Sequence, residues 1–371
     1  MKKIFILTLM CMVIFCSSAY AMADEAFSAC IMNTATGEVV WHKNGNAKHS
    51  MASTTKIMTA LVALENSSIY DVVTISENAA GTEGSSMYVH EGEQYLMHDM
   101  LYGLMLNSGN DAAIAIAEHI SGSTQAFVEL MNKKAYEFGA LDTQFQNPNG
   151  LDHDGHYTTA YDLCIIASYA LKNDAFREIV ATKYREVYPQ NSDRLISLGN
   201  HNKLLSRYEG CIGVKTGFTE KTGRCLVSAA ERDGMTFVAV TLDDKHDWES
   251  HTQMLDYCFS EHTPFKVINE NDCVRVIDVD TNSYKLVYKN SYSIPMRDQA
   301  PAVLVKNHIT PSFVGGVNAG EKIGYAQIIY NDVVIDTVDI VCESEMPPLD
   351  TFKMRRSFLS IFNRVSENLL F

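Results

Sequence analysis

Apolar residues recur at helical spacing in several stretches of the 371-residue chain, and polar turn residues separate these stretches. Ile57, Leu61 and Leu64 follow one another at positions i, i+4 and i+7, which predicts a helix that starts near Ser53. Further apolar stretches predict helices over residues 99–106, 111–117, 125–138 and 159–171. The 111–117 stretch has almost no polar position, so we expect this helix to be buried inside its domain.

Strand patterns lie on both sides of these helices. Residues 26–33 and 38–42 flank turn residues at 34–37 and predict an N-terminal hairpin. Residues 211–215, 224–231 and 235–241 predict three later strands, the last two joined by a turn at 232–234, before a helix over about 248–259. This order predicts one α/β domain over residues 24–262, in which the hairpin joins the later strands in a mainly antiparallel sheet flanked by helices.

The pattern changes after about residue 263, where only short alternating stretches follow. Residues 274–279, 285–288, 302–305, 323–330 and 333–341 predict strands, and Asn331-Asp332 turns the last pair. We therefore expect a small C-terminal all-β domain over residues 263–345. It carries no combination of side chains suited to catalysis.

The two ends of the chain have patterns of their own. Lys2 and Lys3 precede a mostly apolar run at 4–16, and small residues follow, which is typical of a cleaved secretory signal peptide over residues 1–21. In residues 352–371, apolar side chains recur at helical spacing, with four basic residues against a single glutamate. This predicts an amphipathic membrane-anchor tail over residues 346–371. A helix that docks on its own domain is the alternative.

Composition adds limits to this picture. A net charge of −15, without a basic cluster, argues against nucleic acid as a partner. Two of the nine cysteines fall in the signal peptide, and the other seven form no C-x-x-C pair, so we expect free, mostly buried thiols and no zinc site. Residues 152–156, Asp-His-Asp-Gly-His, resemble a ligand cluster, but the glycine and the turn context favour a solvated loop. We expect neither a metal nor a cofactor.

Three short elements carry candidate chemistry. In Ser53-Thr54-Thr55-Lys56, one helical turn would place an amine beside a hydroxyl, although a serine N-cap followed by a solvated lysine fits the same letters. Ser108-Gly109-Asn110 breaks two buried helices, and buried polar side chains need partners, which indicates a site or a local capping network. Lys215-Thr216-Gly217 ends a predicted strand, whereas the second copy, Lys221-Thr222-Gly223, lies in the following loop.

In this order, the S-x-x-K, S-x-N and K-T-G elements resemble those of the penicillin-recognising serine acyltransferases. The chain resembles the low-molecular-mass D-alanyl-D-alanine carboxypeptidases, which are penicillin-binding proteins of peptidase family S11, over essentially its whole mature length. The stretches that carry the resemblance are Ala52-Ser53-Thr54-Thr55-Lys56-Ile57-Met58-Thr59, Gly84-Ser85-Ser86-Met87, Leu106-Asn107-Ser108-Gly109-Asn110-Asp111-Ala112-Ala113, Asn149-Gly150-Leu151-Asp152 and Gly213-Val214-Lys215-Thr216-Gly217-Phe218-Thr219. The resemblance implies a penicillin-binding/β-lactamase-like transpeptidase domain, a β-rich domain and a C-terminal anchor.

The resemblance also implies a role for each matched residue. Ser53 would be the acylated nucleophile, Lys56 its general base, and Ser108 a proton relay toward the leaving D-Ala amine. Asn110 would hold the substrate amide, Lys215 and Thr216 of the Lys-Thr-Gly element would face the terminal carboxylate, and the backbone N–H groups of Ser53 and Phe218 would form the oxyanion hole. Burial and the nearby Lys215 would both lower the pKa of Lys56, as a general base requires.

The implied substrate is a peptidoglycan stem peptide that ends in D-Ala-D-Ala, and the implied inhibitors are β-lactams, which acylate the same serine. The implied location is the outer face of the cytoplasmic membrane. One departure stands out: the chain reads Asn200-His201-Asn202 where some members carry Asn-Arg-Asn, so no carboxylate contact is implied there.

Three alternatives remain. A peptidoglycan endopeptidase uses the same acyl-enzyme and is not separated from a carboxypeptidase by sequence. A serine β-lactamase would need a deacylating glutamate in a Glu-x-x-Leu-Asn loop, which the chain lacks. A membrane-tethered wall-binding protein with a dead site fits poorly, because every catalytic position is filled.

Overall fold

The computed structural model describes residues 22–279, 281–298, 302–310 and 316–348. The predicted signal peptide and the predicted anchor tail from residue 349 onward lie outside these ranges. In the part of the chain that the structure describes, no helix is both long and apolar enough to cross a membrane.

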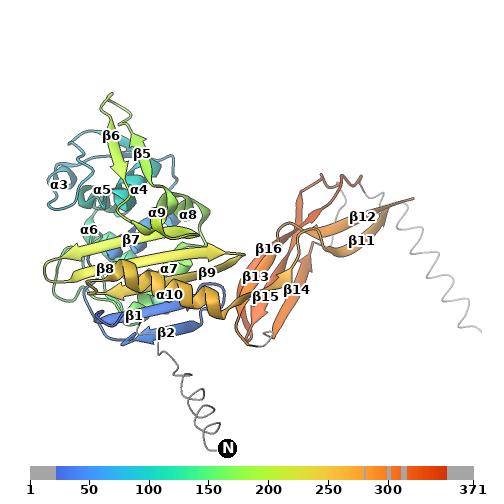
Figure 1. The fold of residues 1–371 in the computed structure, drawn as a ribbon. Coiled ribbons are helices and arrows are strands. Elements are labelled where there is room, and N and C mark those ends of the chain that lie inside the picture. The colour runs from blue at the N-terminus through green and yellow to red at the C-terminus, as the bar shows by residue number, and fades with distance from the viewer. Residues whose placement is uncertain (1–21, 280, 299–301, 311–315, 349–371) are drawn as a thin grey trace, which may run out of the picture.

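A five-stranded antiparallel sheet with strand order β2-β1-β9-β8-β7 forms the centre of the larger domain (Figure 1). The predicted N-terminal hairpin is confirmed as β1 (Ser28–Asn33) and β2 (Val39–Lys43). Strand β1 also pairs with β9 (Met235–Leu242), so the two ends of the domain meet in the middle of the sheet. Strands β8 (Gly223–Arg232) and β7 (Cys211–Thr219) complete it, and β7 forms one edge.

Helices cover both faces of this sheet because both faces carry apolar side chains. On one face lies α10 (Asp247–Glu261), which packs against β8 and β9 (Figure 1). The opposite face adjoins the main core, which is built by five helices: α2 (Lys56–Asn66), α4 (Met97–Leu106), α5 (Asn110–Ser121), α6 (Thr124–Glu137) and α7 (Ala160–Ala170). The first eight residues of α5 are all buried, which confirms the prediction from its missing polar face.

Several short elements were not predicted from the sequence. They are α3 (Glu77–Ala80), α8 (Asp174–Ala181), α9 (Leu204–Arg207), the hairpin of β5 (Tyr184–Val187) with β6 (Ile196–Gly199), and β4 (Gln94–Leu96), which pairs with the predicted β3 (Val72–Thr74). The β5–β6 hairpin projects from the helical side of the domain (Figure 1). A polar, mostly exposed connection separates its strands, so alternation extends over too few residues to be recognised.

The C-terminal domain is all-β, as predicted, and has its own apolar core. Its main sheet has the order β11-β12-β16-β15-β14, and β10 pairs separately with β13. The strands are β10 (Thr263–Ile268), β11 (Cys273–Val279), β12 (Asn282–Tyr288), β13 (Tyr292–Met296), β14 (Val303–Ile309), β15 (Lys322–Tyr330) and β16 (Val333–Cys342). Strands β10 and β13 were missed because each contains a proline, and Pro264 lies opposite Pro295.

The structure corrects two details of the sequence interpretation. Ser53 does not begin an α-helix: it lies in a 3-10 turn, η1 (Ala52–Thr55), which precedes α2. Lys215-Thr216-Gly217 does not end its strand but lies inside β7, which continues to Thr219. The described cysteines are free, and all are buried except Cys211, which is half-buried, and Cys273, which is exposed.

Candidate active site

The turn η1 and the first residue of α2 bring the proposed nucleophile and base together. Lys56 is fully buried, and its Nζ lies 2.9 Å from the Ser53 Oγ. Ser53 itself is half-buried and lines a cavity of about 300 Å³ that opens to solvent. The spacing in Ser53-x-x-Lys56 therefore places the amine beside the hydroxyl, as predicted, although the turn between them is a 3-10 turn and not part of an α-helix.

Two other oxygens hold the Lys56 amine. Its Nζ donates to the Asn110 Oδ1 at 2.7 Å and to the Asn149 carbonyl at 2.5 Å. Burial, together with the nearby Lys215 ammonium, holds the pKa of Lys56 well below its usual range. A neutral amine has only two N–H groups, and these two oxygens accept both. The lone pair is then left to accept the Ser53 hydroxyl proton, which is the arrangement a general base needs.

Asn110 and Ser108 stand at the break between α4 and α5. The Asn110 Nδ2 donates to the Glu83 carbonyl at 2.7 Å, so this side chain bridges Lys56 and the segment of residues 83–95, of which Ser85 lines the cavity. Ser108 is buried, has a φ of 60° and lines the cavity with Ser53. The predicted polar break is thus part of the site.

Strand β7 forms the facing wall. Lys215 is 2% exposed, its Nζ donates to the Thr216 carbonyl at 2.9 Å, and burial lowers its pKa to about 7. Thr216, Gly217 and Phe218 line the cavity, with Phe218 at the exposed rim. A Cβ at Gly217 would lie 3.1 Å from the Ser53 backbone nitrogen, so glycine lets β7 approach the nucleophile turn closely.

The remaining cavity wall was not predicted from the sequence. Two cations approach the Trp248 ring, with the Lys203 Nζ 5.9 Å and the Arg224 guanidinium 5.8 Å from its centre. Arg224 also donates to both carboxylate oxygens of Asp247. His201, for which the sequence implied no contact, lines the same cavity, as does Cys225. Trp248 is one of only two tryptophans, but no motif marks these residues.

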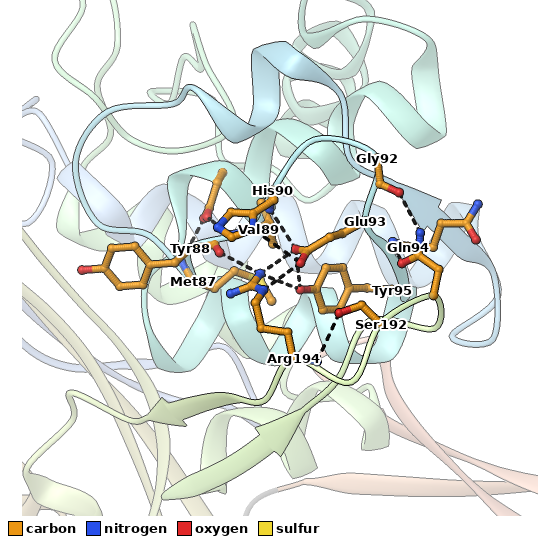
Figure 2. A network of polar contacts seen from close by, with 12 residues as sticks. Met87, Tyr88, Val89, His90, Gly92, Glu93, Gln94, Tyr95, Ser192 and Arg194 are labelled. Atoms are coloured by element: carbon orange, nitrogen blue, oxygen red, sulfur yellow. Dashed lines mark hydrogen bonds and ion pairs between the residues drawn. The ribbon is translucent and has the colours of Figure 1, made fainter.

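An ion pair between the buried Glu93 and the half-buried Arg194 braces residues 83–95 (Figure 2). Arg194, from the β5–β6 connection, donates to both Glu93 carboxylate oxygens, to the Tyr88 carbonyl at 2.9 Å and to the Tyr95 hydroxyl at 3.1 Å. Burial is the largest single influence on Glu93 and opposes its ionisation, but the hydrogen bonds from Arg194, the His90 N–H and the Tyr95 hydroxyl, with the charge of Arg194, together lower the Glu93 pKa to about 2.

The hairpin and α5 hold this segment from two sides. At the base of the hairpin, the Gly199 N–H donates to the Asn107 Oδ1 at 2.9 Å, next to Ser108. Asp111, which follows Asn110, accepts the Ser86 hydroxyl at 2.5 Å and the Met87 N–H at 3.1 Å. Residues 83–95 are therefore fixed to the elements that carry Ser108 and Asn110.

Among the described residues, no three His, Cys, Asp or Glu side chains are grouped so that they could hold a metal ion. In the 152–156 loop, His153 and Asp154 are exposed, as predicted, but His156 is only 4% exposed. The solvated-loop interpretation was therefore wrong for His156, whose ring packs against Phe145.

Known proteins resemble this chain over most of the larger domain. The family model for D-alanyl-D-alanine carboxypeptidase, peptidase S11, matches residues 16–246. The chain is 38% identical over 274 residues to the D-alanyl-D-alanine carboxypeptidase DacF of Bacillus subtilis, which covers 72% of this chain and 70% of the relative. It is 34% identical over 239 residues to DacC of Escherichia coli, covering 61% of this chain and 58% of the relative.

Solved structures show the same fold. The Streptomyces K15 DD-transpeptidase is 35% identical and superposes with a TM-score of 0.61, over 64% of this chain and 97% of its own. The carboxypeptidase DacD from Francisella tularensis is 28% identical, with a TM-score of 0.60, over 87% of this chain and 94% of its own. The predicted penicillin-binding α/β fold is thereby confirmed. The chain belongs to peptidase family S11, the D-alanyl-D-alanine carboxypeptidases.

Proposed function

We propose that the chain removes the terminal D-Ala from peptidoglycan stem peptides that end in D-Ala-D-Ala, through an acyl-enzyme on Ser53. One observation carries the proposal: the buried Lys56 amine, with both N–H groups accepted by other oxygens, lies 2.9 Å from the Ser53 hydroxyl. This contact is suited to proton removal from a serine nucleophile.

In the proposed reaction, the Ser53 oxygen attacks the carbonyl carbon of the penultimate D-Ala while its proton moves to Lys56. The backbone N–H groups of Ser53 and Phe218 stabilise the negative charge that develops on the carbonyl oxygen. As the C–N bond breaks, the leaving D-Ala amine takes up a proton by way of Ser108. Water then hydrolyses the ester, and Lys56 serves again as the base.

Lys215 and Thr216 are the proposed contacts of the terminal carboxylate. Lys215 is buried and its pKa is about 7, so a substrate anion beside it would raise that pKa and favour the ammonium form. The Asn110 side chain already makes hydrogen bonds to the Lys56 amine and the Glu83 carbonyl. We therefore propose that its main role is to position Lys56 and that its contact with the substrate amide is secondary.

β-Lactams would acylate Ser53 in the same way, because their ring carbonyl takes the place of the scissile amide. We also propose the division into a signal peptide over residues 1–21, a catalytic domain over 24–262, a β-rich domain over 263–345 and a membrane-anchor tail over 346–371. The end of α10 at Glu261 and the start of β10 at Thr263 support the boundary between the two domains. The proposed location is the outer face of the cytoplasmic membrane.

The test is a pair of measurements. Mass spectrometry of penicillin-treated protein should locate the adduct on Ser53, and Ser53→Ala should abolish it; an adduct that survives this change refutes the assignment. D-Ala release should then be compared between a pentapeptide and a cross-linked muropeptide. Faster cleavage of the cross-link would identify an endopeptidase instead.

A further inference from the structure

The peptide bond between Ala52 and Ser53 is held by a buried chain of hydrogen bonds. Ala52 has a φ of 46°, a conformation that residues with a side chain rarely adopt, so its surroundings must fix it. The Ala52 carbonyl accepts the Thr55 hydroxyl at 2.7 Å. The Thr55 Oγ1 lies 2.8 Å from the His156 Nε2, and all three residues are buried.

The direction of this chain follows from the partner of the other ring nitrogen. The backbone N–H of Gln146 points at the His156 Nδ1 at 3.0 Å, so Nδ1 must be an acceptor and the ring is neutral with its proton on Nε2. The His156 Nε2–H therefore donates a hydrogen bond to the Thr55 Oγ1, and the Thr55 hydroxyl in turn donates a hydrogen bond to the Ala52 carbonyl. Burial favours the same neutral form, because it lowers the pKa of His156 to about 4.

Gly150 also shapes the surroundings of the Ala52 carbonyl. A Cβ at Gly150 would lie 2.0 Å from the Ala52 oxygen, so only glycine leaves room for it. The preceding residue, Asn149, holds the Lys56 amine through its own carbonyl. One loop, residues 146–156, thus supports both the base and the peptide that precedes the nucleophile.

In a planar trans peptide, the carbonyl and the following N–H point in opposite directions. A carbonyl held toward Thr55 and Gly150 therefore turns the Ser53 N–H to the opposite side. Building on the proposed function, we propose that His156 and Thr55 are positioning residues that orient the Ser53 N–H as an oxyanion donor.

The experiment compares two neighbouring threonines. Thr55→Val removes the hydroxyl that holds the Ala52 carbonyl. Thr54→Val is the matched control, because Thr54 is equally buried and its hydroxyl donates at 2.6 Å to the carbonyl of Met51, one peptide earlier. Stopped-flow acylation of the full chain by a penicillin separates the non-covalent binding constant from the acylation rate constant, and thermal melts report stability.

We expect both valine variants to melt earlier than the wild type. Only Thr55→Val should lower the acylation rate constant, by about tenfold or more, with the binding constant unchanged, because a misdirected oxyanion donor affects the transition state alone. Equal acylation rate constants in the two variants would overturn the proposal.

Substitutions of His156 provide a second, independent comparison. In His156→Gln, the amide oxygen can accept the Gln146 N–H while the amide nitrogen donates to Thr55, so most of the rate should remain. His156→Leu should lower the acylation rate constant as much as Thr55→Val does. A folded His156→Leu protein with the wild-type acylation rate constant would contradict the proposal. A wild-type protein that penicillin does not acylate at Ser53 would refute the proposed function instead.

Discussion

The proposed mechanism gives two buried lysines opposite tasks. In it, Lys56 would be neutral to accept a proton, whereas Lys215 would be charged to attract a carboxylate. Both are buried, but Lys56 also experiences the Lys215 ammonium, so its pKa is lowered further. At the residue scale, we therefore expect activity in the pH range above the pKa of Lys56 and below the pKa of Lys215, where Lys56 is neutral and Lys215 is charged.

This order of pKa values predicts a bell-shaped pH dependence of kcat/KM for D-Ala release. The acid limb reports protonation of Lys56. The alkaline limb should begin near pH 7, because the Lys215 pKa of about 7 means that the free enzyme loses this charge as the pH rises. Lys215→Arg keeps its charge to far higher pH and should move the alkaline limb upward. A wild-type profile that stays level between pH 7 and 9 would contradict the assignment of Lys215.

At the scale of elements, the sequence predicted those with long apolar periods and missed those held by polar contacts. The central sheet and the helices α4 to α7 follow from hydrophobic spacing. The β5–β6 hairpin does not, because its attachment depends on Arg194 and on the Asn107 side chain rather than on an apolar face. These partners are about a hundred residues distant in the chain, so local patterns do not indicate them.

The Arg194–Glu93 ion pair should contribute more to the free energy of unfolding than an exposed ion pair does. Arg194→Met leaves the Glu93 carboxylate, which is 11% exposed, without its cation, and we expect a loss of about 3 kcal/mol in the free energy of unfolding. Arg297→Met removes a contact to Glu261 at an exposed site, where solvent screens the two charges, and should lower the free energy of unfolding much less. Denaturant titrations measure both, and equal losses would show that the pair does not brace the hairpin.

Helix α10 contributes an acid-sensitive contact with the sheet. His251 is fully buried, its Nδ1 lies 2.5 Å from the Ser228 hydroxyl and its Nε2 lies 3.1 Å from the Thr241 hydroxyl. Burial lowers its pKa to about 3, so folding favours the neutral ring.

In the unfolded chain the His251 pKa returns to about 6.5, so the unfolded state binds the proton first as the pH falls below that value. Stability should therefore be unaffected above pH 6.5 and decrease by roughly 3 kcal/mol by pH 4 through this residue. His251→Gln should show a shallower decrease over the same range in pH-dependent melts. Identical pH slopes for the two proteins would exclude His251 as the cause.

At the scale of the whole molecule, the proposed active site lies within the larger domain, and none of the described residues of the β-rich domain lines its cavity. Each domain has its own apolar core. This arrangement agrees with a β-rich domain that connects the enzyme to its C-terminal tail rather than one that takes part in catalysis.

The proposed anchor is tested on the whole protein. Deletion of residues 352–371 should release the mature protein from membranes without reducing its penicillin acylation, because the described residues that line the cavity all belong to the larger domain. Replacing Lys353, Arg355 and Arg356 with glutamate should weaken sedimentation with anionic vesicles, because the tail would then be repelled by the lipid headgroups. Sedimentation that neither change reduces would refute the anchor.

The sequence by itself determined the two-domain order, the antiparallel sheet and the three short elements of the site, because each depends on local spacing or on residue type. Only the tertiary structure decided how the Lys56 amine is buried beside Lys215 and oriented, since Asn110 and Asn149 reach it from segments far away in the chain. Likewise, a histidine in a polar Asp-His-Asp-Gly-His stretch resembles a solvated residue. Its burial behind Thr55 follows from long-range packing, which periodicity does not record.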